Sequence, residues 1–147
     1  MARASGLELA GGSARNDPLQ ATTRGTGELI AAAARGGARR IIVGVGGSAT
    51  TDGGLGAITA LGWKLPAGVP VVVACDVTTR FLEAASVYGP QKGATRAQVE
   101  LLTRRLRRLA DEYEQRTGIA VTELEHGGAA GGLAGGLAVL GARLESG

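Results

Sequence analysis

The sequence lacks several features that would assign a function at once: it has one cysteine, one histidine and no GxxxxGK[ST] phosphate-binding loop. The lone cysteine, Cys75, excludes an internal disulfide framework and is typical of a reducing compartment, so we predict a cytoplasmic protein. The lone histidine, His126, excludes a metal site built from several histidines.

Aromatic residues are scarce and scattered, with four in 147 residues. Stacking platforms for single-stranded nucleic acid need several aromatic side chains on one face, so we predict no nucleic-acid partner. No apolar run approaches the length of a membrane span, and no signal-peptide pattern follows Met1, so we predict no membrane partner. The net charge of +3 is mild and agrees with a small anionic ligand.

Glycine, in contrast, is abundant. The 26 glycines concentrate in residues 44–56 and 127–141, inside patterned sequence, which argues against a disordered low-complexity chain. With 44% apolar and 20% charged residues, the chain is predicted to form one folded domain over residues 1–147.

The most informative stretch covers residues 41–61. Residues 41–45 form a short β-branched run that is typical of a buried parallel strand. Glycines and hydroxyl residues follow it, and residues 57–61, closed by Gly62, predict a short helix. A strand, a glycine-rich loop and a helix in this order place free N–H groups against an anion.

Three further helices are expected. Residues 28–35 favour a helix with Glu28 in its first turn. Residues 95–117 carry a capping box and one apolar stripe. Residues 133–140 keep a helical leucine spacing despite many glycines, which points either to close packing or to a ligand near the backbone. Arginines off the stripe indicate a solvated face or a phosphate patch: Arg104, Arg105, Arg107 and Arg108.

A second strand is predicted at residues 69–75, ending at Asp76. Residues 7–9 and 119–121 are candidates for short strands, and residues 78–93 show no periodicity and predict a loop. The chain is therefore predicted to be an α/β fold, with helices layered on a small parallel or mixed sheet.

The glycine-rich loop supplies the candidate anion ligands. Hydroxyls there either bind phosphate or a hydroxy acid, or cap the following helix. The pattern Gly44-x-Gly46-x-x-Ala49 matches a dinucleotide-binding loop in outline only. The candidate phosphate- and substrate-binding residues are Gly46, Gly47, Ser48, Thr50 and Thr51.

Two carboxylates and one lysine are candidates for catalysis. Asp52 is either an N-cap or a catalytic or metal-binding carboxylate. Asp76 is placed where ligands bind in open α/β sheets. Lys92 either neutralises phosphate charge or is an exposed loop lysine, and Cys75 is interpreted as a packed strand residue.

Six sequence runs, in order and covering most of the chain, resemble the bacterial type I glycerate kinase family. These runs are residues 4–9, residues 22–30, residues 42–50 with 52–54, residues 73–78, residues 88–94 and residues 128–132. The resemblance implies ATP-dependent phosphoryl transfer to glycerate. It also implies ATP and Mg²⁺ as cofactors, with glycerate and nucleotide as the small-molecule partners.

Family members have two α/β domains, one flavodoxin-like and one inserted in its middle, and this chain resembles the middle portion only. The resemblance implies that the loop residues present donors to anionic oxygens. Asp52 or Asp76 would orient the hydroxyl or hold Mg²⁺, and Lys92 would offset charge. The chain departs from the family pattern by a shortened segment at residues 66–68 and an altered one at residues 79–84.

Two alternatives stay open at this point. One is a nucleotide-binding module without kinase chemistry, and the other is a catalytically silent kinase fragment that self-associates. The few strands predicted leave the apolar stripe of residues 99–113 without an evident cover, so we expect a homodimer.

Overall fold

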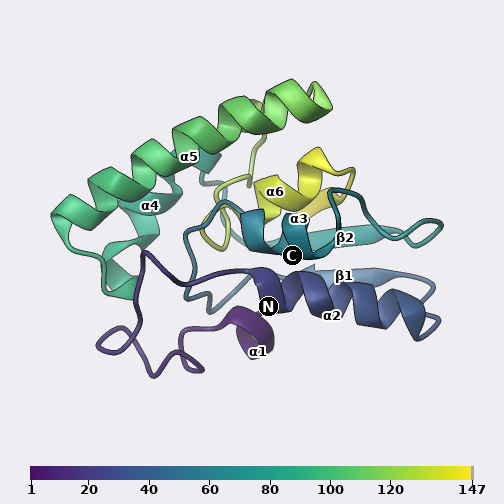
Figure 1. The fold of residues 1–147 in the computed structure, drawn as a ribbon, viewed down its shortest axis with the longest axis horizontal. Coiled ribbons are helices and arrows are strands. Elements are labelled where there is room, and N and C mark those ends of the chain that lie inside the picture. The colour runs from purple at the N-terminus through teal and green to yellow at the C-terminus, as the bar shows by residue number, and fades with distance from the viewer. Residues whose placement is uncertain (147) are drawn as a thin grey trace.

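One sheet of three parallel strands organises the fold (Figure 1). The computed structural model describes residues 1–146. The strands β1 (Ile41–Gly44), β2 (Val71–Cys75) and β3 (Arg143–Ser146) pair in the order β1-β2-β3, and both pairs are parallel. The α/β class predicted from the sequence is confirmed, and the sheet is parallel rather than mixed.

Three helices cover one face of this sheet: α2 (Arg24–Arg35), α3 (Leu55–Ala60) and α6 (Leu133–Val139). Alternate residues of β1 are buried beneath them, whereas Ile42 on the other face is 64% exposed. The side chains that form this core come from all three helices and from the inner face of β1 and β2: Ile30, Ile41, Val43, Ala57, Val71, Val73, Cys75, Leu133 and Leu137.

The long helix α5 (Arg96–Thr117) is labelled in Figure 1, and its buried residues Leu102, Leu106, Leu109 and Tyr113 form one apolar stripe. Both hydrogen bonds of the predicted capping box between Thr95 and Gln98 are present, and Gly118 ends the helix with a φ of 74°. Although α5 has 22 residues, no helix within residues 1–146 combines the length and the apolar character that a membrane span requires.

A second core covers the stripe of α5. Its largest members are buried side chains of α5 and of the segments that face it: Leu102, Leu106, Leu109, Tyr113, Phe81, Val121 and Val139. The Tyr113 hydroxyl donates to the Gly53 carbonyl at 2.8 Å, which ties α5 to the glycine-rich loop. The expectation that this stripe lacks a cover is therefore wrong.

The two short strands predicted at residues 7–9 and 119–121 are also wrong. Residues 7–9 form turns beside a single antiparallel bridge between Gly6 and Ser48. A 3₁₀ turn, η3 (Val121–Glu123), replaces the other strand. Runs of three residues offer few ladder hydrogen bonds, so the local apolar pattern does not decide their conformation.

The segment predicted as a loop at residues 78–93 contains three short helical elements. These are η1 (Phe81–Glu83), α4 (Ala84–Tyr88) and η2 (Pro90–Lys92), and the prediction of a loop is wrong. Phe81 is completely buried against α5, so tertiary packing orders a segment whose own periodicity is weak.

The helix predicted at residues 28–35 begins earlier, at Arg24. Glu28 therefore lies beyond the first turn, and its predicted position is wrong. Instead, the Glu28 carboxylate pairs with the Arg24 guanidinium at 2.8 Å across one turn of the exposed surface. A short helix, α1 (Ala2–Ser5), precedes it at the start of the chain.

The glycines in and before α6 serve close packing, one of the two explanations for this glycine-rich segment, since a Cβ at Gly136 would lie 2.6 Å from the Gly53 carbonyl oxygen. A Cβ at Gly131 would lie 1.9 Å from the Thr50 carbonyl oxygen, and one at Gly128 would lie 2.3 Å from the Arg80 carbonyl oxygen. Gly128 and Gly131 therefore lie directly against other backbone, where only glycine fits.

Candidate functional site

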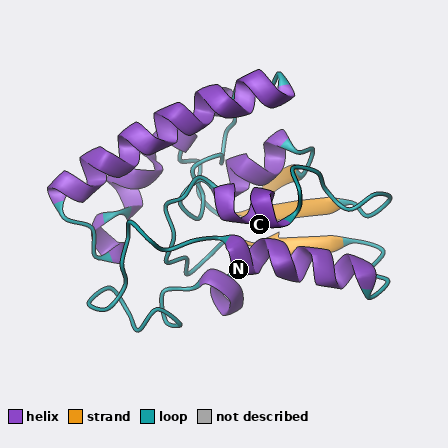
Figure 2. Cartoon of the chain, in the orientation of Figure 1, coloured by secondary structure: helices purple, strands orange, loops and turns teal. Residues whose placement is uncertain are grey.

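Loops that follow two neighbouring strands meet at one edge of the sheet (Figure 2). Since β1 and β2 are parallel, with Gly44 opposite Ala74, residues 46–48 and Asp76 emerge at the same edge. A cavity of about 270 Å³ lies there, which we call the strand-end cavity. It is lined by Leu7, Val45, Gly46, Gly47, Ser48, Asp76, Val77, Tyr88, Gln91, Lys92, Ala129 and Ala130.

The loop at residues 46–48 presents its backbone to the strand-end cavity. Gly47 has a φ of 68°, a conformation that favours glycine, and a Cβ at Gly46 would meet no atom within 4 Å. Within residues 1–146, none of the backbone hydrogen bonds in turns and loops uses the N–H of Gly46, Gly47 or Ser48. These three donors can therefore bind an anion.

Neighbouring segments hold this loop in place. The Leu7 N–H donates to the Gly47 carbonyl at 2.9 Å, and the Ala49 N–H donates to the Ser5 carbonyl at 3.0 Å. The segment at residues 5–7 thus holds the Gly47 carbonyl and the Ala49 N–H, while the N–H groups of residues 46–48 stay available within residues 1–146.

Lys92, at the end of η2, brings a positive charge to the strand-end cavity. Its side chain is buried, 2% exposed, and its Nζ donates to the Thr50 carbonyl at 2.6 Å. The Nζ also lies 5.8 Å from the centre of the Tyr88 ring. Burial lowers the pKa of Lys92 to about 8, and the nearby Asp52 carboxylate opposes that shift. An ammonium has three N–H donors, so two remain for a ligand.

Asp76 is the carboxylate that lines the strand-end cavity. Its side chain is exposed and takes part in no hydrogen bond or salt bridge among residues 1–146. Because the Asp76 side chain is exposed to water, it has no desolvation cost as an unpaired carboxylate. Its position at the cavity follows only from its place at the end of β2. The carboxylate is free to accept a proton from a hydroxyl or to hold a cation.

Asp52 lies outside the strand-end cavity and is held by hydrogen bonds. Its carboxylate accepts from the Thr23 N–H and hydroxyl, both at 2.8 Å, from the Gly54 N–H at 3.1 Å and from the Gly56 N–H at 3.2 Å. These donors begin α2 and α3, so Asp52 joins the first turns of two helices. This arrangement corresponds to the capping alternative for Asp52.

The predicted ligands Thr50 and Thr51 are not brought into the strand-end cavity. Both are buried, 1% and 2% exposed, and their Oγ1 atoms have no hydrogen-bond partner within the described residues. Thr50 contributes through its carbonyl, which positions the Lys92 ammonium. Thr51 lines a different cavity, beside α5.

Three residues that the sequence did not single out contribute to the strand-end cavity. Tyr88 and Gln91 line it from α4 and η2. The Asn16 side-chain amide donates to the Ala49 carbonyl at 3.0 Å and to the Lys92 carbonyl at 2.9 Å, which fastens η2 to the glycine-rich loop. Asn16 lies in a polar turn, and its sequence gives no signal of this contact.

The remaining candidates have structural positions. Burial, with the Asp76 carboxylate as a second cause, raises the pKa of the Cys75 thiol to about 11, so Cys75 stays protonated at neutral pH. His126 Nδ1 lies 2.6 Å from the Val77 carbonyl oxygen. The four arginines in the middle of α5 are exposed, as expected of a solvated face: Arg104, Arg105, Arg107 and Arg108.

Comparison with known proteins identifies relatives along the whole chain. A sequence model described as the glycerate kinase family matches residues 1–69 and 64–147. A glycerate kinase of Bacillus subtilis (strain 168) is 42% identical over 165 aligned positions, covering 90% of this chain and 43% of the relative. A glycerate 2-kinase of Escherichia coli (strain K12) is 40% identical over 180 aligned positions, covering 100% of this chain and 47% of the relative.

A solved structure shares the fold. The crystal structure of a protein proposed to be glycerate kinase 2, from Salmonella typhimurium LT2, superposes with a TM-score of 0.92 at 38% identity, covering 99% of this chain and 48% of that one. The chain thus spans about half the length of the curated relatives it matches. The family match divides near residues 64–69, where the sequence predicts a shortened segment.

Proposed function

The chain belongs to the glycerate kinase family, and from that premise we propose that its strand-end cavity binds the acceptor and the transferred phosphate in ATP-dependent phosphorylation of glycerate. One observation carries the proposal. Three separate segments bring the free N–H groups of residues 46–48, the Asp76 carboxylate and the Lys92 ammonium to one cavity. Phosphoryl transfer depends mainly on positioning and on charge neutralisation, and these groups can provide both.

Each group has a distinct role in this proposal. The N–H groups of Gly46, Gly47 and Ser48 hold anionic oxygens of the phosphate or of the glycerate carboxylate. The Lys92 ammonium, fixed by the Thr50 carbonyl, offsets charge on the transferred group. Asp76 either orients the attacking hydroxyl and accepts its proton or holds Mg²⁺.

Mg²⁺ fits the same residues. Within residues 1–146, no three His, Cys, Asp or Glu side chains gather as a metal site, but Mg²⁺ usually takes one or two protein carboxylates and completes its shell with phosphate oxygens and water. Asp76 would be that carboxylate, since the Asp52 oxygens already accept several N–H and O–H donors. The ion would neutralise charge on the phosphates.

Asp76→Asn is expected to lower glycerate-dependent turnover by about a hundredfold or more, because the amide can neither accept the proton nor hold Mg²⁺. The melting temperature should stay unchanged, since the Asp76 side chain is exposed and unpaired among the described residues. A coupled ADP-release assay and thermal melting measure the two effects.

Asp52→Asn is the matched control. It is expected to lower the melting temperature, because the carboxylate that caps α2 and α3 loses its charge. If Asp76→Asn retained full turnover, or if it lowered stability as much as Asp52→Asn does, the role proposed for Asp76 would be wrong.

A nucleotide-binding module without kinase chemistry, or a silent fragment, is the second candidate. The observation that favours it is the length of the chain, about half that of its curated relatives. Kinases close parts of the chain around both substrates to exclude water. The same assay separates the candidates: a binding module would take up nucleotide but release ADP equally slowly with and without Asp76.

The location of the protein and its oligomeric state are also proposals. The proposal of a cytoplasmic location rests on the lone cysteine.

The proposal of a homodimer is no longer supported by the apolar stripe of α5, because other side chains of the chain cover that stripe. Its remaining support is exposed apolar surface at Leu29 and at Ile42 on the open face of β1. Light scattering at several protein concentrations measures it.

A further inference from the structure

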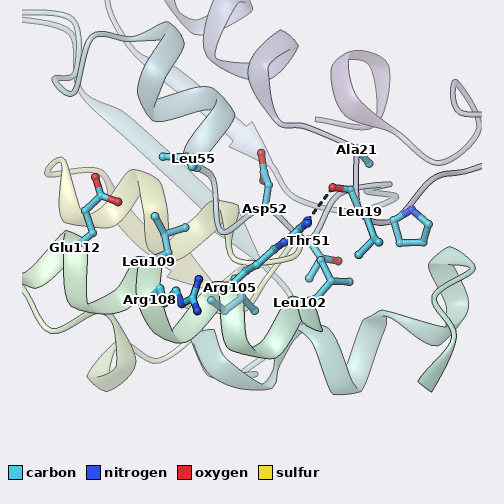
Figure 3. Close-up of a pocket in the computed structure, with 12 residues that line it drawn as sticks. Leu19, Ala21, Thr51, Asp52, Leu55, Leu102, Arg105, Arg108, Leu109 and Glu112 are labelled. Atoms are coloured by element: carbon cyan, nitrogen blue, oxygen red, sulfur yellow. Dashed lines mark hydrogen bonds between the residues drawn. The ribbon is translucent and has the colours of Figure 1, made fainter. Parts of the chain in front are cut away.

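A second cavity, of about 300 Å³, lies between α5 and the segment at residues 17–22 (Figure 3). It shares no lining residue with the strand-end cavity, and we call it the α5 cavity. Its volume is in the range of small-molecule sites. Its walls are mainly apolar, and the side chains that form them are Leu19, Leu55, Leu102, Leu106 and Leu109.

Two arginines bring positive charge to this cavity. Among residues 1–146, neither Arg105 nor Arg108 takes part in a salt bridge. Arg105 donates one hydrogen bond, to the Leu19 carbonyl at 3.0 Å (Figure 3), which leaves most of its five donors unused. Both guanidiniums can therefore bind an anion.

Of the two acidic residues that line the α5 cavity, one pairs with an arginine and the other is held by hydrogen bonds. Glu112 lies 2.9 Å from the Arg116 guanidinium. Asp52 accepts hydrogen bonds from Thr23, Gly54 and Gly56. With Arg116 counted, three guanidiniums and two carboxylates lie at the cavity, so the charge there is positive by one.

A buried hydroxyl in the wall supplies an independent sign of a ligand. Thr51 is 2% exposed, and its Oγ1 has no hydrogen-bond partner within the described residues. Buried hydroxyls are normally satisfied, because leaving one unpaired costs free energy. An acceptor atom bound in the α5 cavity would satisfy it.

We propose that the α5 cavity binds a small carboxylate with an aromatic or branched apolar body. The body lies among the leucines, the carboxylate meets Arg105 and Arg108, and one of its oxygens accepts from the Thr51 hydroxyl. A guanidinium fork matches the two oxygens of a carboxylate. The site does not depend on the proposed kinase function, because none of its residues belongs to the strand-end cavity.

The test uses 2-naphthoate as the probe and its uncharged analogue 2-naphthamide as the reference, titrated into the full chain by calorimetry. We expect saturable one-to-one binding of 2-naphthoate and weaker binding of 2-naphthamide. Arg108→Gln and Thr51→Val should each raise the dissociation constant of 2-naphthoate by about tenfold. Arg107→Gln is the matched control, since Arg107 is exposed on the same helix but does not line the cavity, and it should leave binding unchanged.

Two results would overturn the inference. One is the absence of saturable 2-naphthoate binding at millimolar concentration. The other is equal binding by wild type, Arg108→Gln and Thr51→Val. Thr51→Val keeps the side-chain shape and removes an unpaired hydroxyl, so it should fold as well as wild type, which circular dichroism checks.

Discussion

Replacing Lys92 with methionine is expected to raise the dissociation constant for phosphoglycerate by about a hundredfold or more. Methionine fills much of the buried space but carries no charge and no donor. Lys92 is 2% exposed, so water cannot easily replace the ammonium there. Calorimetric titration measures the affinity, and thermal melting confirms that the variant is folded.

The control for this prediction is the other lysine of the chain. Lys64 is exposed and does not line the strand-end cavity, so Lys64→Met removes the same charge from the whole protein without touching the site. It should bind phosphoglycerate as wild type does. Equal affinities for Lys92→Met and Lys64→Met would mean that Lys92 takes no part in anion binding.

Phosphoglycerate affinity is also expected to fall as the pH rises through about 8, because the buried Lys92 ammonium then loses its proton. The unfolded chain has the ordinary lysine pKa of 10.5 and binds more protons than the folded chain between about 8 and 10.5, so Lys92 makes stability rise with pH across that window. Titrations at pH 7 and pH 9 should differ for wild type and agree for Lys92→Met.

Gly131→Ala is expected to lower the free energy of unfolding by about 3 kcal/mol or more. Its Cβ would lie 1.9 Å from the Thr50 carbonyl oxygen, and Gly131 has a φ of 69°. The contacted atom is backbone and cannot rotate away. Because the same carbonyl positions the Lys92 ammonium, the variant should also weaken anion binding.

Gly118→Ala separates backbone strain from the clash. Gly118 has a φ of 74°, but a Cβ there would meet nothing within 4 Å, so the expected loss is only about 1 kcal/mol. Urea denaturation of both variants gives the comparison. Equal losses at the two positions would contradict the close contact between Gly131 and Thr50.

Strong local patterns predicted the fold, and weak ones did not. The capping box and leucine stripe of α5, and the β-branched runs of β1 and β2, decide those elements locally. β3 was not predicted because Arg143–Ser146 is polar and mostly exposed. It becomes a strand by pairing with β2, a contact between residues about 70 positions apart.

The candidate site was predictable to a similar degree. Gly46, Gly47, Ser48 and Asp76 follow strands that pair in parallel, so topology alone brings them together. The carboxylates Asp52 and Asp76 look alike in the sequence, and only their hydrogen-bond partners separate a cap from a free group. Contacts such as that of Asn16 with Lys92 join distant segments, and no local pattern encodes them.

The most direct test of the strand-end cavity as the anion site is a titration of the ¹⁵N-labelled chain with phosphoglycerate, followed by the backbone amide signals in ¹H–¹⁵N spectra. The account predicts that the largest shifts occur at Gly46, Gly47 and Ser48, whose N–H groups are free in the loop, while amides in the exposed turns of α5 stay unchanged. Saturation with no shift at these three amides would contradict it.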